Sequence, residues 1–312
     1  MIAEADESDA SFLHLQPMVA VVTNIDEDHM STYDGDVEKL KRTFIEFLHN
    51  LPFYGFVVLC LDDEKAASIQ EFVTRPILTY GVNDQADFVA SNIHLEKRGS
   101  EFVVSRPEGK QPLTIKLNIP GHHNVLNATS AVAVATEEGV SDAAIIAGLE
   151  KFQGVGRRFE ELGNFPVAGG VATLVDDYGH HPTEVKAIID AVRAGWPERR
   201  LVMVYQPHRY SRTNDLFDDF VEVLSQVDKL IMLDVYAAGE KTIPGADTKA
   251  LCRSMRERGE IEPLYVSDPS NVVDVVGKLV RGGDIVITQG AGNISQVAAQ
   301  LQQAQLQVVS DE

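Results

Sequence analysis

The chain has 312 residues and a formal net charge of −20, which argues against a nucleic-acid-binding surface. Its 44% hydrophobic and 24% charged residues are typical of a globular protein, and its length suits two domains. No apolar run could span a membrane, the N-terminus has no signal-peptide pattern, and two cysteines, Cys60 and Cys252, are too few for a disulfide framework. These features indicate a reducing, cytoplasmic environment.

The first half of the chain, up to about residue 155, is rich in predicted strands. The strands are predicted at residues 18–25, 56–61, 76–82, 102–105 and 113–119. Helices are predicted at residues 35–48, 124–138 and 141–152, and loops at 62–71 and 96–101. Ser141 is the predicted N-cap of the last helix.

The second half alternates strands with amphipathic helices. Its strands are predicted at residues 171–176, 201–205, 229–235, 263–266 and 284–289. Its helices are predicted at residues 183–194, 213–226, 247–258, 270–281 and 294–303. This alternation predicts a parallel sheet covered on both faces, in a Rossmann-like, doubly wound arrangement. Two glycines before a basic pair, at residues 154–158, predict a boundary between domains 1–156 and 157–312.

Four carboxylates stand close to the start of the chain, at Glu4, Asp6, Glu7 and Asp9, and His29 follows the first predicted strand. Hard oxygen ligands and an imidazole near strand ends indicate a divalent-metal site. Because natural termini usually fray, a cluster of this kind also leads us to expect a preceding segment.

Polar residues also follow the predicted strands of the second half, where ligands of parallel sheets bind. These loops carry Asp176 to Pro182, Gln206 to Arg212, Asp234 to Gly239 and Gln289 to Asn293. Arg209 and Arg212 suit a carboxylate or phosphate, and His180 and His181 could hold a polar substrate.

Each of these residues also has a structural interpretation. Asp176 could cap a helix, Pro182 could be its first residue, and His181 could be a satisfied core histidine. Asn124 and Asn127 could read an adenine edge, but a helix N-cap and a surface residue are the simpler interpretation. A metal hydrolase built on Asp176 and its neighbours is a distant alternative.

Six segments, taken together, resemble the Mur ligase family over essentially the whole chain. They are Glu4 to Phe12, Thr23 to Met30, Gly121 to Asn127, Arg157 to Glu160, Asp176 to Pro182 and Pro207 to Arg212. Within that family, the chain is most similar to the members that join L-alanine to UDP-N-acetylmuramate in peptidoglycan synthesis.

The resemblance implies an ATP-dependent amide ligase that works through an acyl phosphate and uses ATP and Mg²⁺. It implies an incomplete central ATPase-type α/β domain followed by a Rossmann-like domain, and no protein partner is evident. For the ligands, the resemblance assigns Glu4 and His29 to magnesium, Asn124 and Asn127 to adenine, and Arg158 and Asp176 to ATP. It assigns Tyr178, His180, Arg209 and Arg212 to the substrates, with His180, Arg209 and Arg212 also serving catalysis. Lys39 and Lys41 are expected to be solvated lysines.

The family's uridine-nucleotide domain and its Gly-Lys-Thr phosphate loop do not occur in this sequence. We therefore expect a fragment that is inactive alone, because the loop supplies the main phosphate contacts. A murein peptide ligase of cell-wall recycling and a non-catalytic nucleotide- or amino-acid-binding fragment are the alternatives. We also expect an unpaired, apolar edge near residues 19–25 and a more stable second half.

Overall fold

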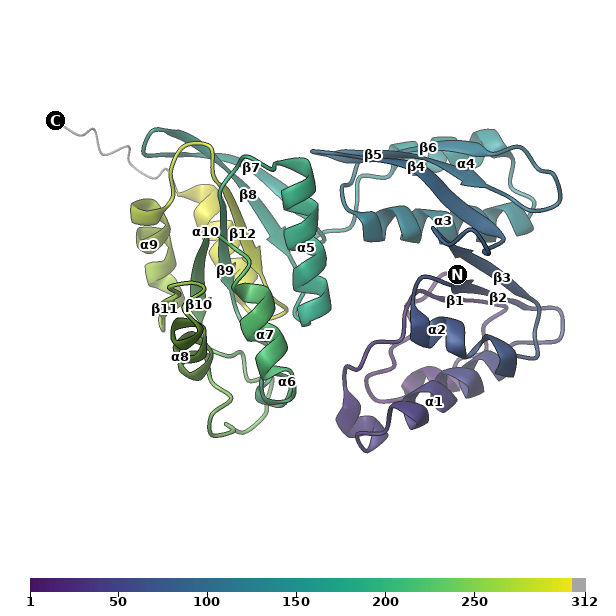
Figure 1. The fold of residues 1–312 in the computed structure, drawn as a ribbon, viewed down its shortest axis with the longest axis horizontal. Coiled ribbons are helices and arrows are strands. Elements are labelled where there is room, and N and C mark those ends of the chain that lie inside the picture. The colour runs from purple at the N-terminus through teal and green to yellow at the C-terminus, as the bar shows by residue number, and fades with distance from the viewer. Residues whose placement is uncertain (305–312) are drawn as a thin grey trace. The chain divides into compact units, whose positions relative to one another are not determined.

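The computed structural model describes residues 1–304 and divides into two compact units, Met1–Gln153 and a second that begins at Gly154. Each unit is built on its own six-stranded sheet with helices packed against it (Figure 1). The predicted α/β fold class is confirmed, with parallel pairing dominant in both sheets.

The first sheet has its strands in chain order, and it changes from parallel to antiparallel pairing partway across. Its strands are β1 (Val19–Val22), β2 (Phe56–Cys60), β3 (Ile77–Gly81), β4 (Phe88–Glu96), β5 (Gly99–Ser105) and β6 (Leu113–Leu117). Strands β1 to β4 pair in parallel, whereas β4, β5 and β6 form an antiparallel meander.

Helices cover both faces of this sheet. They are α1 (Val37–His49), α2 (Glu64–Ser68), α3 (His122–Glu137) and α4 (Asp142–Lys151), with 3-10 turns at Ser11–His14, Met30–Tyr33 and Gln70–Phe72. Because side chains alternate along a strand, Val57 and Leu59 of β2 pack in the cluster of α1 and α2. Val58 and Cys60 pack instead in the cluster of α3 and α4.

The second sheet has the order β11-β10-β9-β12-β8-β7, so its last strand in sequence lies at its centre. The strands are β7 (Glu160–Val167), β8 (Gly170–Asp177), β9 (Leu201–Tyr205), β10 (Lys229–Leu233), β11 (Leu264–Val266) and β12 (Ile285–Gln289). All pairs are parallel except β7 with β8. The carboxyl ends of β8, β12, β9 and β10 therefore meet at one edge, where the site is built.

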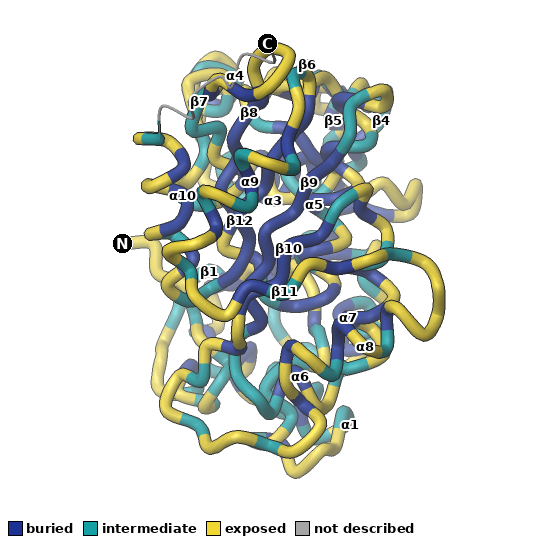
Figure 2. Tube along the Cα trace, turned by 90° about the vertical axis from the view of Figure 1, so that its left-hand side faces the viewer, coloured by how far each residue is buried: buried dark blue, intermediate teal, exposed yellow. Residues whose placement is uncertain are grey.

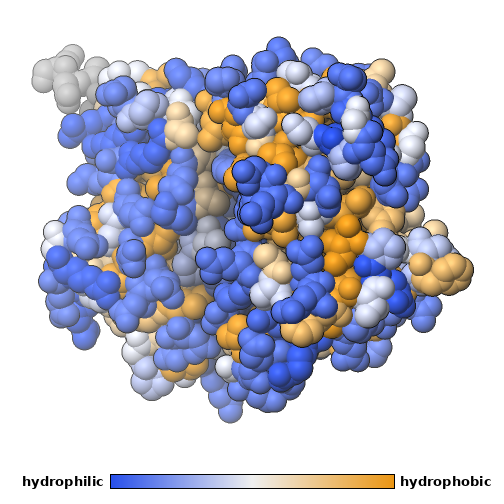
Figure 3. All heavy atoms as spheres, turned by 45° about the vertical axis from the view of Figure 1, so that its right-hand side comes forward, coloured by the Kyte–Doolittle hydropathy of each residue, from blue (hydrophilic) through white to orange (hydrophobic). Residues whose placement is uncertain are grey.

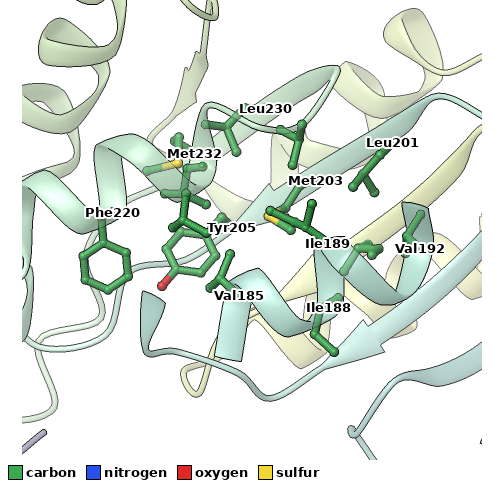
Figure 4. Packing of buried hydrophobic residues seen from close by; sticks show 14 of the residues in the cluster. Val185, Ile188, Ile189, Val192, Leu201, Met203, Tyr205, Phe220, Leu230 and Met232 are labelled. Carbon is green, nitrogen blue, oxygen red and sulfur yellow. The ribbon is translucent and has the colours of Figure 1, made fainter. Parts of the chain in front are cut away.

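The helices of the second unit form two layers. They are α5 (Pro182–Gly195), α6 (Tyr210–Asp215), α7 (Phe217–Leu224), α8 (Thr248–Arg258), α9 (Val272–Leu279) and α10 (Ile294–Gln303), with a 3-10 turn at Pro269–Asn271. Leu201, Met203 and Tyr205 of β9 pack with α5 and α7 (Figure 4) and with α8, whereas Val202 and Val204 pack with α9 and α10. Figure 2 shows the central strands buried throughout, as expected for a doubly wound sheet.

Several elements differ from the sequence-based predictions. Strands β4 and β7 were not predicted, and helix α2 occupies the predicted loop at 62–71. The predicted helix at 213–226 is two helices, α6 and α7, separated at Leu216 (φ −115°, ψ 29°). Ser141 stands at the N-cap of α4 as predicted, but its side chain makes no capping hydrogen bond.

The face drawn in Figure 3 carries many hydrophilic residues, with hydrophobic residues between them. Exposed hydrophobic residues occur at β1, the edge strand of the first sheet, where Val21 is 42% exposed and the preceding Met18 is 62% exposed. Among residues 1–304, no helix combines the length and the apolar character needed to cross a membrane.

Candidate functional site

Four aromatic rings lie in a row across the strand ends of the second sheet. Tyr178 and His180 follow β8, His208 follows β9 and Tyr236 follows β10. Successive ring centroids are 5.4, 5.5 and 5.5 Å apart, and the rings of His208 and Tyr236 are stacked with an interplanar angle of 8°. This aromatic row joins three loops that are far apart in the sequence.

His208 lies inside a positively charged environment. Burial, together with the positive charges of His180, Arg212 and Arg209, lowers the pKa of His208 to about 4. Arg212 is itself buried, and its Nη1 donates to the His208 carbonyl oxygen at 3.3 Å. His208 is therefore a neutral imidazole at neutral pH, in contact with cationic neighbours.

Arg209 is held at the start of α6 in an unusual backbone conformation (φ 70°). Its backbone N–H donates to the Tyr236 carbonyl oxygen at 2.9 Å, and its Nη1 lies 3.6 Å from Oε1 of Glu240. Glu240 also accepts hydrogen bonds from the backbone N–H and the hydroxyl of Ser211, at 3.0 and 2.7 Å. Arg209 and Arg212 thus lie close to His208, whose ring also contacts the ring of His180.

Both carboxylate oxygens of Asp176 accept hydrogen bonds from other residues of the protein. Its Oδ2 accepts from Nε of Arg157 at 2.8 Å, and its Oδ1 accepts from the hydroxyl of Thr288 at 2.6 Å. Arg157 also donates to the Gly290 carbonyl oxygen at 2.7 Å, and its guanidinium lies 5.1 Å from the Tyr178 ring centroid. Asp176 is 3% exposed and belongs to β8, so it does not cap a helix.

The N-cap of α5 is His181, with Pro182 as the first helical residue. Glu184 completes a capping box: it accepts from the backbone N–H groups of His180 and His181 at 2.8 and 3.1 Å. Its other oxygen accepts from Nη1 of Arg158 at 2.9 Å. Burial alone would raise the pKa of Glu184, but the charge of His180, its backbone N–H and Arg158 together lower it to about 2.

The carboxylate of Asp177 accepts hydrogen bonds from three segments of the chain near the aromatic row. It accepts from the backbone N–H of Phe159 at 2.9 Å, from that of Gly179 at 2.7 Å and from Nε2 of Gln289 at 3.0 Å. Burial raises the pKa of Asp177 despite these hydrogen bonds. A Cβ at Gly179 would lie 2.6 Å from Nε2 of Gln289 and 2.7 Å from Oδ1 of Asp177, so a larger residue here would displace these side chains.

In the first unit, the N-terminal acidic segment lies against the turn that follows His29. The hydroxyl of Thr32 donates to the Ser8 carbonyl oxygen at 2.6 Å, and that of Tyr33 donates to the Glu7 carbonyl oxygen. Burial raises the pKa of Glu7, against the charge of His29. Glu4 is exposed. The carboxylate oxygens of this acidic segment are ligands of the kind that a hard cation prefers. Residues 1–304 nevertheless contain no group of three or more His, Cys, Asp or Glu arranged to hold a metal.

The two predicted adenine-binding residues lie on α3. Gly121 (φ 102°) occupies the N-cap position, so Asn124 is not the N-cap; its amide donates to the Pro120 carbonyl oxygen at 2.7 Å. Asn127 is exposed. Lys39 and Lys41 pair with Asp34 and Glu38, respectively, at 2.7 and 3.0 Å.

Sequence reasoning did not assign roles to Arg157, Glu184 or Glu240. A signal existed for Glu184, because it follows the helix entry at the spacing of a capping box. Arg157 belongs to the basic pair at the predicted boundary, whereas no local pattern marks Glu240. The pairings of both residues were missed because their partners come from distant segments of the chain.

Comparisons with known proteins agree with this architecture. Three solved structures have the same fold. UDP-N-acetylmuramate-alanine ligase from Thermotoga maritima is 24% identical (TM-score 0.75) and the match covers 95% of this chain and 61% of that one. A MurF ligase from Thermotoga maritima, in complex with ADP, is 20% identical (TM-score 0.68), with 93% and 62% covered. A murein peptide ligase from Psychrobacter arcticus is 19% identical (TM-score 0.67), with 96% and 60% covered.

The chain thus spans about three-fifths of the length of these solved relatives. Family models identify its two units. The Mur ligase middle domain matches residues 2–135, and the Mur ligase glutamate ligase domain matches residues 157–292. With both of its units matched by domains of one family, the chain belongs to the Mur ligase family.

Proposed function

We propose that this chain forms the amino-acid- and ATP-handling part of a ligase that joins L-alanine to UDP-N-acetylmuramate through an acyl phosphate. The observation that carries the proposal is the grouping of Arg209 and Arg212 around the neutral His208, in a Mur ligase glutamate ligase domain. Two guanidinium groups suit an amino-acid carboxylate and the negative charge of an acyl phosphate.

Within this proposal, the aromatic row and the arginines hold the substrates. Arg209 and Arg212 bind the carboxylate of L-alanine and the acyl phosphate, and Tyr178 and His180 form the adjoining wall. His208 is neutral, so it can approach the amine without electrostatic repulsion. Keeping water away from this wall protects the acyl phosphate from hydrolysis.

Candidate nucleotide-binding residues are proposed in each unit by itself. Asn124 and Asn127 bind adenine, Arg158 binds a phosphate group, and Asp176 acts through its ion pair with Arg157. Glu4 and His29 would hold Mg²⁺, which when bound would neutralise charge on the phosphates. The ADP complex of the related MurF ligase supports a nucleotide site in this fold.

A murein peptide ligase is the second candidate, since a protein of that name has the same fold over 96% of this chain. The two candidates differ in the ligand of the arginine site. L-alanine is small, whereas a murein tripeptide must extend beyond the aromatic row. Competition between L-alanine and the tripeptide for one site on the chain would separate them.

The proposal predicts ligand binding without turnover by residues 1–312 alone. We expect L-alanine to shift the NMR signals of the His180 and His208 rings, and Arg212→Ala to abolish that shift. D-alanine provides the stereochemical control. Phosphate release with ATP, Mg²⁺, UDP-N-acetylmuramate and L-alanine is expected to stay at background, because no phosphate loop is present. The absence of any L-alanine response would overturn the amino-acid site, whereas phosphate release would overturn the inactivity.

A further inference from the structure

Glu240 links two of the loops that build the arginine site. It lies after β10, whereas its partners Arg209 and Ser211 lie after β9. We propose that Glu240 is a positioning residue that aims the Arg209 guanidinium at the carboxylate of the bound amino acid. The inference rests on the proposed function and adds to it a residue that does not itself contact the substrate.

The carboxylate of Glu240 is fixed before any ligand arrives. Two hydrogen bonds from Ser211, to Oε2 from the backbone and to Oε1 from the hydroxyl, hold both of its oxygens. Burial opposes ionisation, but these hydrogen bonds and the charge of Arg209 lower the pKa of Glu240. Glu240 is therefore ionised at neutral pH and stands in one orientation.

The side chain of Arg209 requires a contact that restricts its rotation. Its guanidinium lies at the end of a flexible side chain that is 42% exposed, and its buried Nε has no hydrogen-bond acceptor within the described residues. Free rotation of this side chain would cost entropy whenever a ligand binds. The ion pair with Glu240, at 3.6 Å, limits that rotation in advance.

Glu240 could instead compete with an incoming carboxylate for Arg209. The geometry favours positioning, because Glu240 is bonded more closely to Ser211 (2.7 and 3.0 Å) than to Arg209 (3.6 Å). Glu240 can therefore remain in place when Arg209 takes a ligand. Its negative charge also offsets repulsion between Arg209 and Arg212, which lie close to His208.

The test is an NMR titration of the 1–312 chain with L-alanine. Glu240→Gln preserves the size of the side chain but removes its charge, and we expect it to weaken binding roughly tenfold. Glu240→Ala should weaken binding at least as much. Ser211→Ala removes one support of the carboxylate and keeps the charge, so a loss of about threefold is expected. Glu222→Gln, at an exposed acid of α7, is the matched control and should leave binding unchanged.

A second signal separates positioning from a general loss of structure. The Nε–H resonance of Arg209 should exchange faster with solvent in Glu240→Gln, while the amide signals of β9 and β12 stay unchanged. Equal L-alanine affinity in Glu240→Ala and the unsubstituted chain would overturn the assignment of Glu240 alone. Tighter binding in Glu240→Ala would overturn it in favour of competition. A lack of response in the unsubstituted chain would overturn the amino-acid site as well.

Discussion

The protonation state of His208 is controlled by burial and by the charges of its neighbours. His208 is a base surrounded by cations, stacked on Tyr236 and close to Arg209 and Arg212. Burial disfavours its charged form, and the neighbouring positive charges add to that effect. His208 therefore binds a proton only under acidic conditions, and its Nδ1 can accept a hydrogen bond from Nη1 of Arg212 at 3.3 Å.

The protonation of His208 can be measured directly. We expect its ring proton to titrate in NMR with a pKa of about 4, and Tyr236→Ala to raise that pKa toward the ordinary value of 6.5 by admitting water. Because the folded pKa lies below the unfolded one, stability should fall as the pH drops from about 6.5 to about 4. Tyr54→Ala, at an exposed ring of the first unit, is the control and should leave the titration unaltered. A midpoint near 6.5 in the unsubstituted chain would contradict the burial argument.

At the scale of the element, the N-terminus of α5 joins helix capping to the site. Glu184 caps two backbone N–H groups and pairs with Arg158, while His181 and Pro182 begin the helix. The residues that start the helix are thus the neighbours of Tyr178 and His180. A change to the cap will therefore disturb both the stability of the helix and the orientation of the site loop.

Glu184→Gln should destabilise the second unit in a pH-dependent way. The pKa of Glu184 falls from 4.5 to about 2 on folding, so its stabilisation is present above about pH 4.5 and is lost as the pH falls toward 2. The shift corresponds to about 3 kcal/mol, which partial exposure reduces to about 1–2 kcal/mol. Urea unfolding of both chains across this pH range would measure the difference. Asp190→Asn, in the exposed pair with Lys186 on the same helix, should change stability by under about 0.5 kcal/mol at every pH. A constant difference between Glu184→Gln and the unsubstituted chain would show that ionisation is not its cause.

The elements predicted well from the sequence are those with strong patterns. The buried strand β9 was predicted at its observed bounds, and so was helix α10. Strand β7 escaped prediction because Gly163 and Pro166 interrupt it and its exposed face breaks the apolar run. Helix α2 was missed because its cap, Asp63, lies in a charged stretch typical of a loop.

The site was partly predictable for the same reason. Parallel strand order placed His180, Arg209 and Arg212 at one sheet edge, since the loops after parallel strands of one sheet lie at the same edge. The pairings of Arg157 with Asp176 and of Arg209 with Glu240 were not predictable, because they depend on loop conformations. Positive φ angles at Arg157 (60°) and Arg209 (70°) are part of those conformations, and no residue type signals them.

At the scale of the whole molecule, the chain consists of two units with separate cores. Their sheets differ at the edges. Both sheets end in edge strands. In the first unit the edge strand β1 has four residues, with Val21 and the preceding Met18 exposed, whereas the edge strand β7 of the second unit has eight. Unpaired backbone and exposed apolar side chains both favour local opening.

Limited proteolysis should therefore digest the first unit before the second. We expect a resistant fragment beginning near Gly154, together with two unfolding transitions in urea of which the first belongs to the first unit. Val21→Lys should reduce aggregation through the β1 edge without altering the second transition. Survival of a fragment within residues 1–153, with loss of the second unit, would reverse this order.

The position of β12 has a consequence for how the protein is made. Ile285–Gln289 fills the gap between β8 and β9, so the loops that carry His180 and Arg209 have no shared support until that segment arrives. During synthesis, the ribosome must release more than a hundred residues beyond β8 before the sheet can close. Chains interrupted before β12 would expose the apolar edges of both strands to proteases and chaperones. Assembly of the arginine site is thus coupled to completion of the second unit, so the site forms only when β12 has joined the sheet.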